Sequence, residues 1–173
     1  MPTSELPETP CAFDAAFLAD LPYEPSVLLF DQLSEVDPER SRVTCRMPTD
    51  GNLPLTDRQR ADAIRHPRHV AGALLVHATG MLGFVHAYYL LGLRHDAGWI
   101  GYGTHIHAAS FRKLIPPGSP IEARCTATKQ RLGRMRHVIR YSFEFFQDGE
   151  LCYQGDQSAI WFNALAAPRR QLG

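Results

Sequence analysis

Residues 72–93 form an apolar run without a single Asp, Glu, Lys or Arg, and this run constrains the fold more than any other feature of the chain. A segment of that length and polarity predicts a helix that is covered on nearly every side, by protein or by lipid. Two histidines, two tyrosines, a threonine and four glycines dilute its hydrophobicity, and a strand-like pattern follows at once. We therefore expect the central helix of a protein core rather than a membrane span.

Two ionisable rings, His77 and His86, lie inside this helix. Nine residues at about 100° per residue place them on opposite sides of the helix axis. His77, about two turns from the start, is expected to point into apolar space near the beginning of the helix. His86 is interpreted as a structural residue that is hydrogen-bonded in the core.

Bulk composition excludes several classes of protein. The 173 residues suit one domain with a real core. Eighteen basic and eighteen acidic residues cancel, which gives no general attraction to nucleic acid or a membrane surface. The four cysteines show no CxxC spacing, and the N-terminus has no basic segment followed by an apolar one. We expect no disulfide framework, no signal peptide and a cytoplasmic location.

Periodicity and turn signals predict an α+β fold in which an antiparallel β-sheet is wrapped around one long central helix. A short helix is expected at 12–21, and a long irregular loop, of the kind that often carries function, at 48–69. The expected strands span 26–36, 41–47, 98–111, 120–130, 135–147 and 150–162. The predicted organisation is an N-terminal extension with a short helix (1–19), one domain (20–163) and a flexible tail (164–173).

Three segments resemble the 3-hydroxyacyl-[acyl-carrier-protein] dehydratase family, whose members have the hotdog fold. Leu21-Pro22 followed by LLFDQLSEVDPERSRVTC resembles the family's opening strand, LLVDRV-EVDP. The segment AGALLVHATGMLGF (71–84) is similar to its central helix, PGVL-EA-AQ, and IHAASFRKLIPPGSPI (106–121) to its GIDEARFKRPVVPGD element. The resemblance covers about residues 20–162 and implies a hotdog fold and an acyl thioester ligand.

The chain departs from the family pattern at both catalytic positions. The family's acid, a Glu or Asp five residues after the glycine that starts the helix, corresponds to His77. The family's catalytic histidine stands in a GHFP motif nine residues before that glycine, where this chain has Ala63. The nearest candidates are His66, which is followed by proline, and His69. The resemblance therefore supports the fold and the ligand class more strongly than the reaction.

Removing water from a 3-hydroxyacyl thioester requires a base at C2, an acid for the leaving hydroxyl and donors for the enolate-like oxygen. His66 or His69 is expected to be the base, since a neutral imidazole suits that role near neutral pH. His77 is expected to be the acid, a polarising group or a second base. The first amides of the helix, at Gly72 and Ala73, are candidate oxyanion donors. Two further residues, Met81 and Arg112, are expected to contact the substrate.

Several alternatives remain open at this point. A thioesterase on the same fold would need a base for water, and a non-catalytic acyl-binding protein would need neither acid nor base. A homodimer or higher homo-oligomer is expected, with the loop histidine of one chain facing the helix residue of the other. A basic cluster could meet coenzyme A phosphate or an acidic carrier protein, or could be a solvated sheet face. The cluster comprises Arg112, Lys113, Arg131, Arg134, Arg136 and Arg140.

The remaining motifs favour no further cofactor or reaction class. His66 with His69, and His105 with His107, have short spacings, but no carboxylate or thiolate pattern joins them, so we expect no metal site. The chain has no Gly-x-Ser-x-Gly elbow, P-loop or GxGxxG, which disfavours nucleophilic catalysis and nucleotide cofactors. No dissociable cofactor, nucleic acid or membrane partner is therefore expected.

Overall fold

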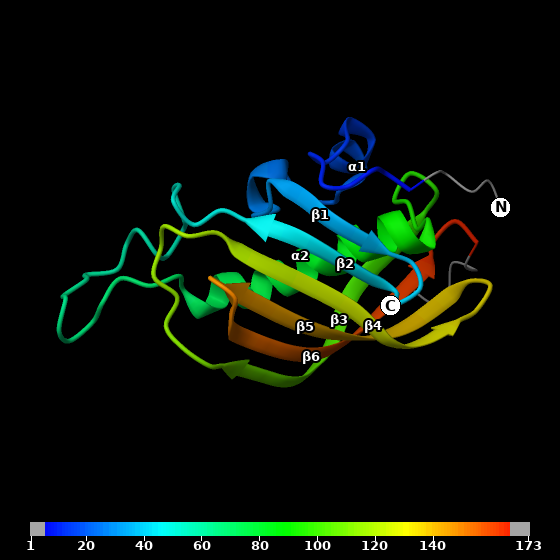
Figure 1. The fold of residues 1–173 in the computed structure, drawn as a ribbon. Helices are drawn as coiled ribbons and strands as arrows, with labels where there is room; N and C mark the ends of the chain where they lie inside the picture. The colour runs from blue at the N-terminus through cyan, green and yellow to red at the C-terminus, as the bar shows by residue number, and fades with distance from the viewer. Residues whose placement is uncertain (1–5, 167–173) are drawn as a thin grey trace.

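The computed structural model describes residues 6–166, and its centre is one long helix on the concave side of one sheet (Figure 1). The helix is α2 (Gly72–Leu91), and the six-stranded sheet is antiparallel with the order β1-β2-β4-β5-β6-β3. The strands are β1 (Gln32–Asp37), β2 (Arg42–Met47), β3 (Trp99–Phe111), β4 (Ile121–Leu132), β5 (Arg136–Gln147) and β6 (Glu150–Asn163). Parts of the predicted N-terminal extension and tail, 1–5 and 167–173, lie outside the described residues.

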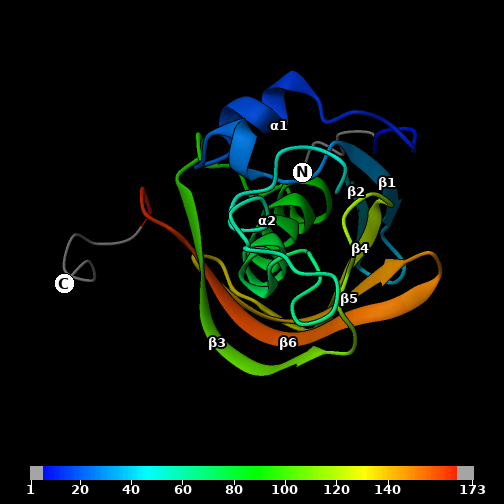
Figure 2. The ribbon, with the colours of Figure 1, turned by 90° about the vertical axis from the view of Figure 1, so that its left-hand side faces the viewer.

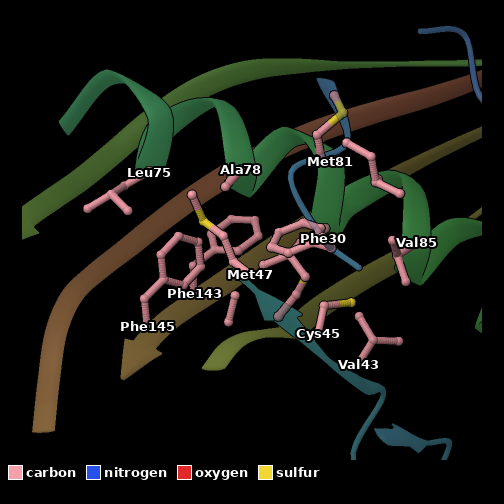
Figure 3. Packing of buried hydrophobic residues seen from close by; sticks show 14 of the residues in the cluster. Phe30, Val43, Cys45, Met47, Leu75, Ala78, Met81, Val85, Phe143 and Phe145 are labelled. Atoms are coloured by element: carbon pink, nitrogen blue, oxygen red, sulfur yellow. The ribbon is translucent and has the colours of Figure 1, made fainter. Parts of the chain in front are cut away.

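The sheet curls around α2, as the view nearly along the helix shows (Figure 2). Inward-facing residues alternate along the strands, and Phe143 and Phe145 of β5 pack toward Leu75 and Ala78 of α2 (Figure 3). Each fully buried aliphatic or aromatic side chain contributes about 1.5–3 kcal/mol of hydrophobic stabilisation. By length and composition α2 could cross a membrane, but here it is the buried core helix, as the sequence predicted.

Helix α1 (Ala15–Asp20) covers part of the side that the sheet leaves open (Figure 2). Asp14 caps it by accepting a hydrogen bond from the Phe17 amide at 2.7 Å. The other carboxylate oxygen of Asp14 accepts a hydrogen bond from the hydroxyl of Tyr89 on α2, also at 2.7 Å. The Phe17 ring is buried against Tyr88, so the segment before the sheet is fastened to the core helix.

The prediction of a strand over 26–36 is wrong in its first half. A 3-10 helix spans Pro25–Val27, and β1 starts only at Gln32. Leu28 is buried, and Leu29 has a positive φ of 67°, which turns the chain out of an extended path. These apolar residues cover the open side of α2 instead of extending the sheet, and periodicity alone does not distinguish the two arrangements.

The other turns follow their residue types. Asp148 and Gly149 have φ values of 52° and 79° and form the predicted two-residue hairpin between β5 and β6. Gly92, with φ 64°, ends α2 in the left-handed conformation that glycine adopts without strain. These turns fix the strand register and so decide which side chains face the helix.

β3 is an edge strand of the sheet. It pairs with β6 on one side, and none of the described strands covers its other side. Several large apolar side chains on it are exposed: Ile100, Tyr102, Ile106 and Phe111. A long, open and partly apolar edge is a ready site for pairing with another strand.

Candidate functional site

A cavity of about 250 Å³ lies between α2 and the concave face of the sheet, near the start of β3, and we call it the helix–sheet pocket. Its lining combines small and aromatic residues with a few polar groups, as is typical of sites for apolar ligands. The polar and aromatic residues are Tyr23, His77, Thr79, Phe84, Tyr102, Tyr141, Phe143, Gln157, Ser158 and Trp161. Among residues 6–166, no carboxylate and no thiol lines this pocket.

His77 lies in the wall of this pocket, and its ring is oriented by the backbone. Its Nε2 lies 2.7 Å from the carbonyl oxygen of Val27, which can only accept, so Nε2 carries the proton and donates it. The other ring nitrogen, Nδ1, has no hydrogen-bond partner among residues 6–166. A neutral His77 therefore presents Nδ1 as an acceptor, and a protonated His77 presents it as a donor.

A second polar group in the pocket was missed by the sequence analysis. The Gln157 amide donates a hydrogen bond to Thr79 Oγ1 at 2.7 Å, and the Thr79 hydroxyl donates to the Val76 carbonyl at 2.6 Å. Gln157 occupies an inward-facing position of β6, between Gly155 and Ala159. The available signal was a polar residue at an inward-facing position of a strand. This signal could be used only once the strand register was known.

His69 and His66 lie in the loop before α2, which extends away from the sheet at that end of the helix (Figure 1). Their rings are in contact, with centroids 5.1 Å apart. The Gln59 side chain hydrogen-bonds both the N–H and the carbonyl of His69, at 3.1 and 2.9 Å. His69 Nδ1 donates to the carbonyl of Pro67 at 2.9 Å, which leaves Nε2 as the exchangeable nitrogen. His69 is thus held firmly, whereas His66 is exposed.

The predicted oxyanion donors lie beside His69. His69 and Gly72 line a hollow of about 230 Å³ together with Phe111, and Ala73 is exposed in the first turn of α2. Among residues 6–166, no side chain caps this end of α2, so its first amides remain available as donors.

The two other predicted contact residues are placed differently. Met81 is buried and lines the helix–sheet pocket with His77. Arg112 follows β3, is exposed, and donates to the side chain of Gln154 at 3.0 Å. It lines neither the helix–sheet pocket nor the hollow at His69.

Within one chain the predicted catalytic histidines form two groups. His69 and His66 lie near Phe111, where β3 ends, and His77 lies in the pocket lined by Gly101, where β3 begins. His77 follows Gly72 by five residues of α2 at 1.5 Å each, so it lies about 8 Å along the helix from the first turn. One chain therefore places the two groups in separate hollows, one at the first turn of α2 and the other farther along the same helix.

His86 lies on the opposite flank of α2, as its spacing from His77 predicted. It is fully buried, with Nε2 2.9 Å from the hydroxyl of Ser41 and Nδ1 3.4 Å from the hydroxyl of Tyr141. Burial lowers the pKa of His86 to about 4, and the contact with Ser41 opposes this shift. A ring that stays neutral and hydrogen-bonded fits the predicted structural role.

The predicted basic cluster does not form one surface. Lys113 pairs with Glu150 at 2.6 Å, and Arg140 pairs with Asp156 at 2.6 Å. The remaining arginines, Arg131, Arg134 and Arg136, lie at or beside the β4–β5 hairpin, away from Arg112 at the end of β3. Within the described part of the chain, no group of three or more His, Cys, Asp or Glu residues is placed to hold a metal ion.

Comparisons with known proteins identify the architecture. No family profile matches the sequence, and no curated protein matches it. Among solved structures, the dehydratase heterocomplex ApeI:P from Xenorhabdus doucetiae aligns with a TM-score of 0.65 at 15% identity, covering 88% of this chain and 95% of that one. A mutant thioesterase from Pseudomonas aeruginosa aligns with a TM-score of 0.58 at 18% identity, covering 91% and 97%.

A thioesterase from Haemophilus influenzae is also similar, with a TM-score of 0.52 at 18% identity and coverage of 78% and 79%. Likeness at such low identity concerns the fold. The chain has the hotdog fold, and the predicted fold class is confirmed.

Proposed function

We propose that this protein is an enzyme that acts on acyl thioesters, and that its reaction is the dehydration of a 3-hydroxyacyl thioester to a trans-2-enoyl thioester. The observation that carries the proposal is His77, an imidazole fixed by the Val27 carbonyl in an apolar pocket whose lining contains no carboxylate. The names of the similar structures, a dehydratase complex and two thioesterases, support thioester chemistry.

Two imidazoles suffice for the elimination. We favour His69 over His66 as the base, because the Gln59 side chain holds the backbone of His69 in place. Nε2 of His69 takes the proton from C2. The C2–H electron pair forms the C2=C3 double bond, and the C3–O bond breaks. His77 delivers a proton from Nδ1 to the departing hydroxyl, which leaves as water. The first amides of α2 at Gly72 and Ala73 stabilise the developing negative charge on the thioester oxygen.

We place the completed site between two chains, because His69 and His77 line separate hollows of one chain. Antiparallel pairing of two β3 edges around a two-fold axis sets the end of one strand beside the beginning of the other. The loop with His69 of one chain then approaches the pocket with His77 of its partner. The exposed apolar side chains of β3 support this homodimer, in which each active site is shared.

The carrier of the acyl group is proposed to be coenzyme A or acyl carrier protein. Arg112 lies at the same end of β3 as His69, is exposed and forms no salt bridge among residues 6–166. It is therefore free to pair with a phosphate at the mouth of the site.

The four free cysteines agree with a reducing, cytoplasmic setting.

Hydrolysis is the second candidate, because two of the similar structures are named as thioesterases. It would use the same amide donors with a histidine to activate water. The absence of a carboxylate from the pocket lining leaves His77 as the base for that reaction.

The experiment separates these reactions by their products. The purified protein is incubated with 3-hydroxybutyryl-coenzyme A and with butyryl-coenzyme A, while enoyl absorbance and free thiol are followed. We expect enoyl product without thiol, because the proposed elimination leaves the thioester bond intact. Thiol release would favour hydrolysis, and binding without either product would favour a non-catalytic acyl-binding protein.

Variants test the shared site. His77→Ala and His69→Ala are each expected to abolish turnover, whereas Gly51→Ala, at an exposed position that lines neither hollow, keeps it. Refolding the two inactive variants together should restore about one quarter of the wild-type rate, since half of randomly assorted dimers are mixed and each has one intact site. No recovery in the mixture would contradict a site built from two chains.

A further inference from the structure

Three glycines open the helix–sheet pocket. Gly80 and Gly83 of α2 and Gly103 of β3 all line it, and a Cβ added at any of them would meet no atom within 4 Å. Gly72 and Gly101 behave differently, since a Cβ there would lie 2.9 Å from the Phe111 ring and 2.5 Å from the Trp161 ring. Close packing therefore explains why Gly72 and Gly101 are glycines, but it does not explain the other three glycines.

Helix stability does not explain Gly80 and Gly83 either. Glycine inside a helix is less favourable than alanine, because it loses more backbone entropy on folding. The two residues are three positions apart and so share one side of α2, the side that faces the pocket. Alanine at either position would give a more stable helix without a clash. At the buried Gly83, alanine would remove empty space inside the pocket, whereas Gly80 is exposed at the rim of the pocket.

The walls around this space are aromatic. The indole of Trp161 lies against the Gly101 backbone, and Phe84 meets it edge-on, with centroids 5.4 Å apart at 87°. Tyr23 in turn meets Phe84 at 5.9 Å and 62°. Ring faces and edges that line a cavity attract another ring through offset and edge-to-face contacts. A linear alkyl chain would leave the glycine openings unfilled and lose those contacts.

We propose that Gly80, Gly83 and Gly103 determine specificity by keeping the pocket wide enough for an acyl group that carries an aromatic ring. This inference rests on the proposed function, because it takes the pocket as the place where the acyl group of the thioester lies. The ring occupies the space beside Gly83, between α2 and Trp161, while the thioester end stays near His77.

The test compares ligands with equal numbers of carbon atoms. Binding is measured by calorimetry for 5-phenylpentyl-coenzyme A and undecyl-coenzyme A, two thioethers that the enzyme can neither hydrolyse nor dehydrate. Both carry the same number of alkyl and aryl carbons, so their ratio reports shape rather than hydrophobic content. Butyl-coenzyme A measures binding that does not reach Gly83. The full-length protein is used in every case.

We expect the wild type to bind the phenyl ligand about tenfold more tightly than the undecyl ligand, which corresponds to a difference of roughly 1.4 kcal/mol in binding free energy. Gly83→Leu should erase this preference. Gly83→Ala should weaken phenyl binding while raising Tm by about 2–4 °C. Gly51→Ala is the matched control, because Gly51 is equally open but lies outside the pocket, and it should leave both affinities unchanged.

Two results would overturn the inference. One is a wild type that binds the undecyl ligand as tightly as the phenyl ligand, and the other is a Gly83→Leu variant that keeps the preference. If Gly83→Leu does not fold, Gly83→Ala and Gly103→Ala decide by the same ratio. Neither thioether reacts, so the binding preference can be measured even if the protein lacks dehydratase activity. Lack of that activity would contradict the proposed function, and the binding ratio would still test the shape of the pocket.

Discussion

The buried histidine of α2 allows a quantitative prediction about pH. His86 is fully enclosed, and its pKa is lowered to about 4 from 6.5, chiefly because burial disfavours the charged ring. At about 1.36 kcal/mol for each pH unit, this difference corresponds to roughly 3 kcal/mol of folding free energy. The stability of the whole domain should therefore depend measurably on one proton.

The direction follows from which state binds that proton. The folded pKa lies below the unfolded one, so between pH 6.5 and about 4 the unfolded chain binds the proton more readily. The contribution of His86 is fully present above pH 6.5 and is lost as the pH falls to about 4. Carboxylates titrate in the same range, so a comparison with a variant is needed to isolate this group.

The assay is urea unfolding at several pH values and one fixed protein concentration, for the wild type and for His86→Gln. Glutamine keeps a polar atom near Ser41 and does not titrate, so the variant should lose roughly 1–2 kcal/mol at pH 7. The difference between the two proteins should shrink and then reverse as the pH falls below about 5. His66→Gln, on an exposed loop histidine, should keep the wild-type pH dependence. Parallel curves for His86→Gln and the wild type would refute the reasoning.

Two further predictions concern stability. Gly101→Val should destabilise the protein by about 1–3 kcal/mol or more, because its Cβ would overlap the Trp161 ring. Gly103→Val on the same strand should not destabilise it, since no atom lies within 4 Å of that Cβ position. Chemical unfolding followed by tryptophan fluorescence measures the stability of both variants. Asp14→Ala should cost about 1–2 kcal/mol, since it removes the cap of α1 and leaves the Tyr89 hydroxyl without its acceptor. Asp14→Asn should recover most of that loss, and equal Tm values for the two Asp14 variants would contradict the capping argument.

The sequence predicted the elements of the fold well where one local signal dominated. The charge-free run became α2, and the Asp148-Gly149 pair became the hairpin turn. Both signals are short-range, since backbone conformation and burial on all sides can be read from neighbouring residues. The strand predicted over 26–36 failed in its first half because Leu28 is apolar for a different reason, namely to cover the open side of α2.

The candidate site was only partly predictable. His77 was predicted because an ionisable ring in an apolar helix is conspicuous, and His69 because it precedes the helix; both assignments stay predictions. Gln157 was missed, since its inward direction depends on strand register, and the Val27 carbonyl was missed because its meeting with His77 spans fifty residues. No spacing in the sequence indicates that pair.

The linear order of residues by itself determined that this chain would build a curved antiparallel sheet around one apolar helix, because burial and turn chemistry act between near neighbours. Only the folded arrangement decided that the ring of His77 is held by Val27 and that His86 is buried on the other flank. It also decided that His69 and His77 line separate hollows. These outcomes depend on contacts between distant segments, whose geometry exists only after the sheet has closed over the helix.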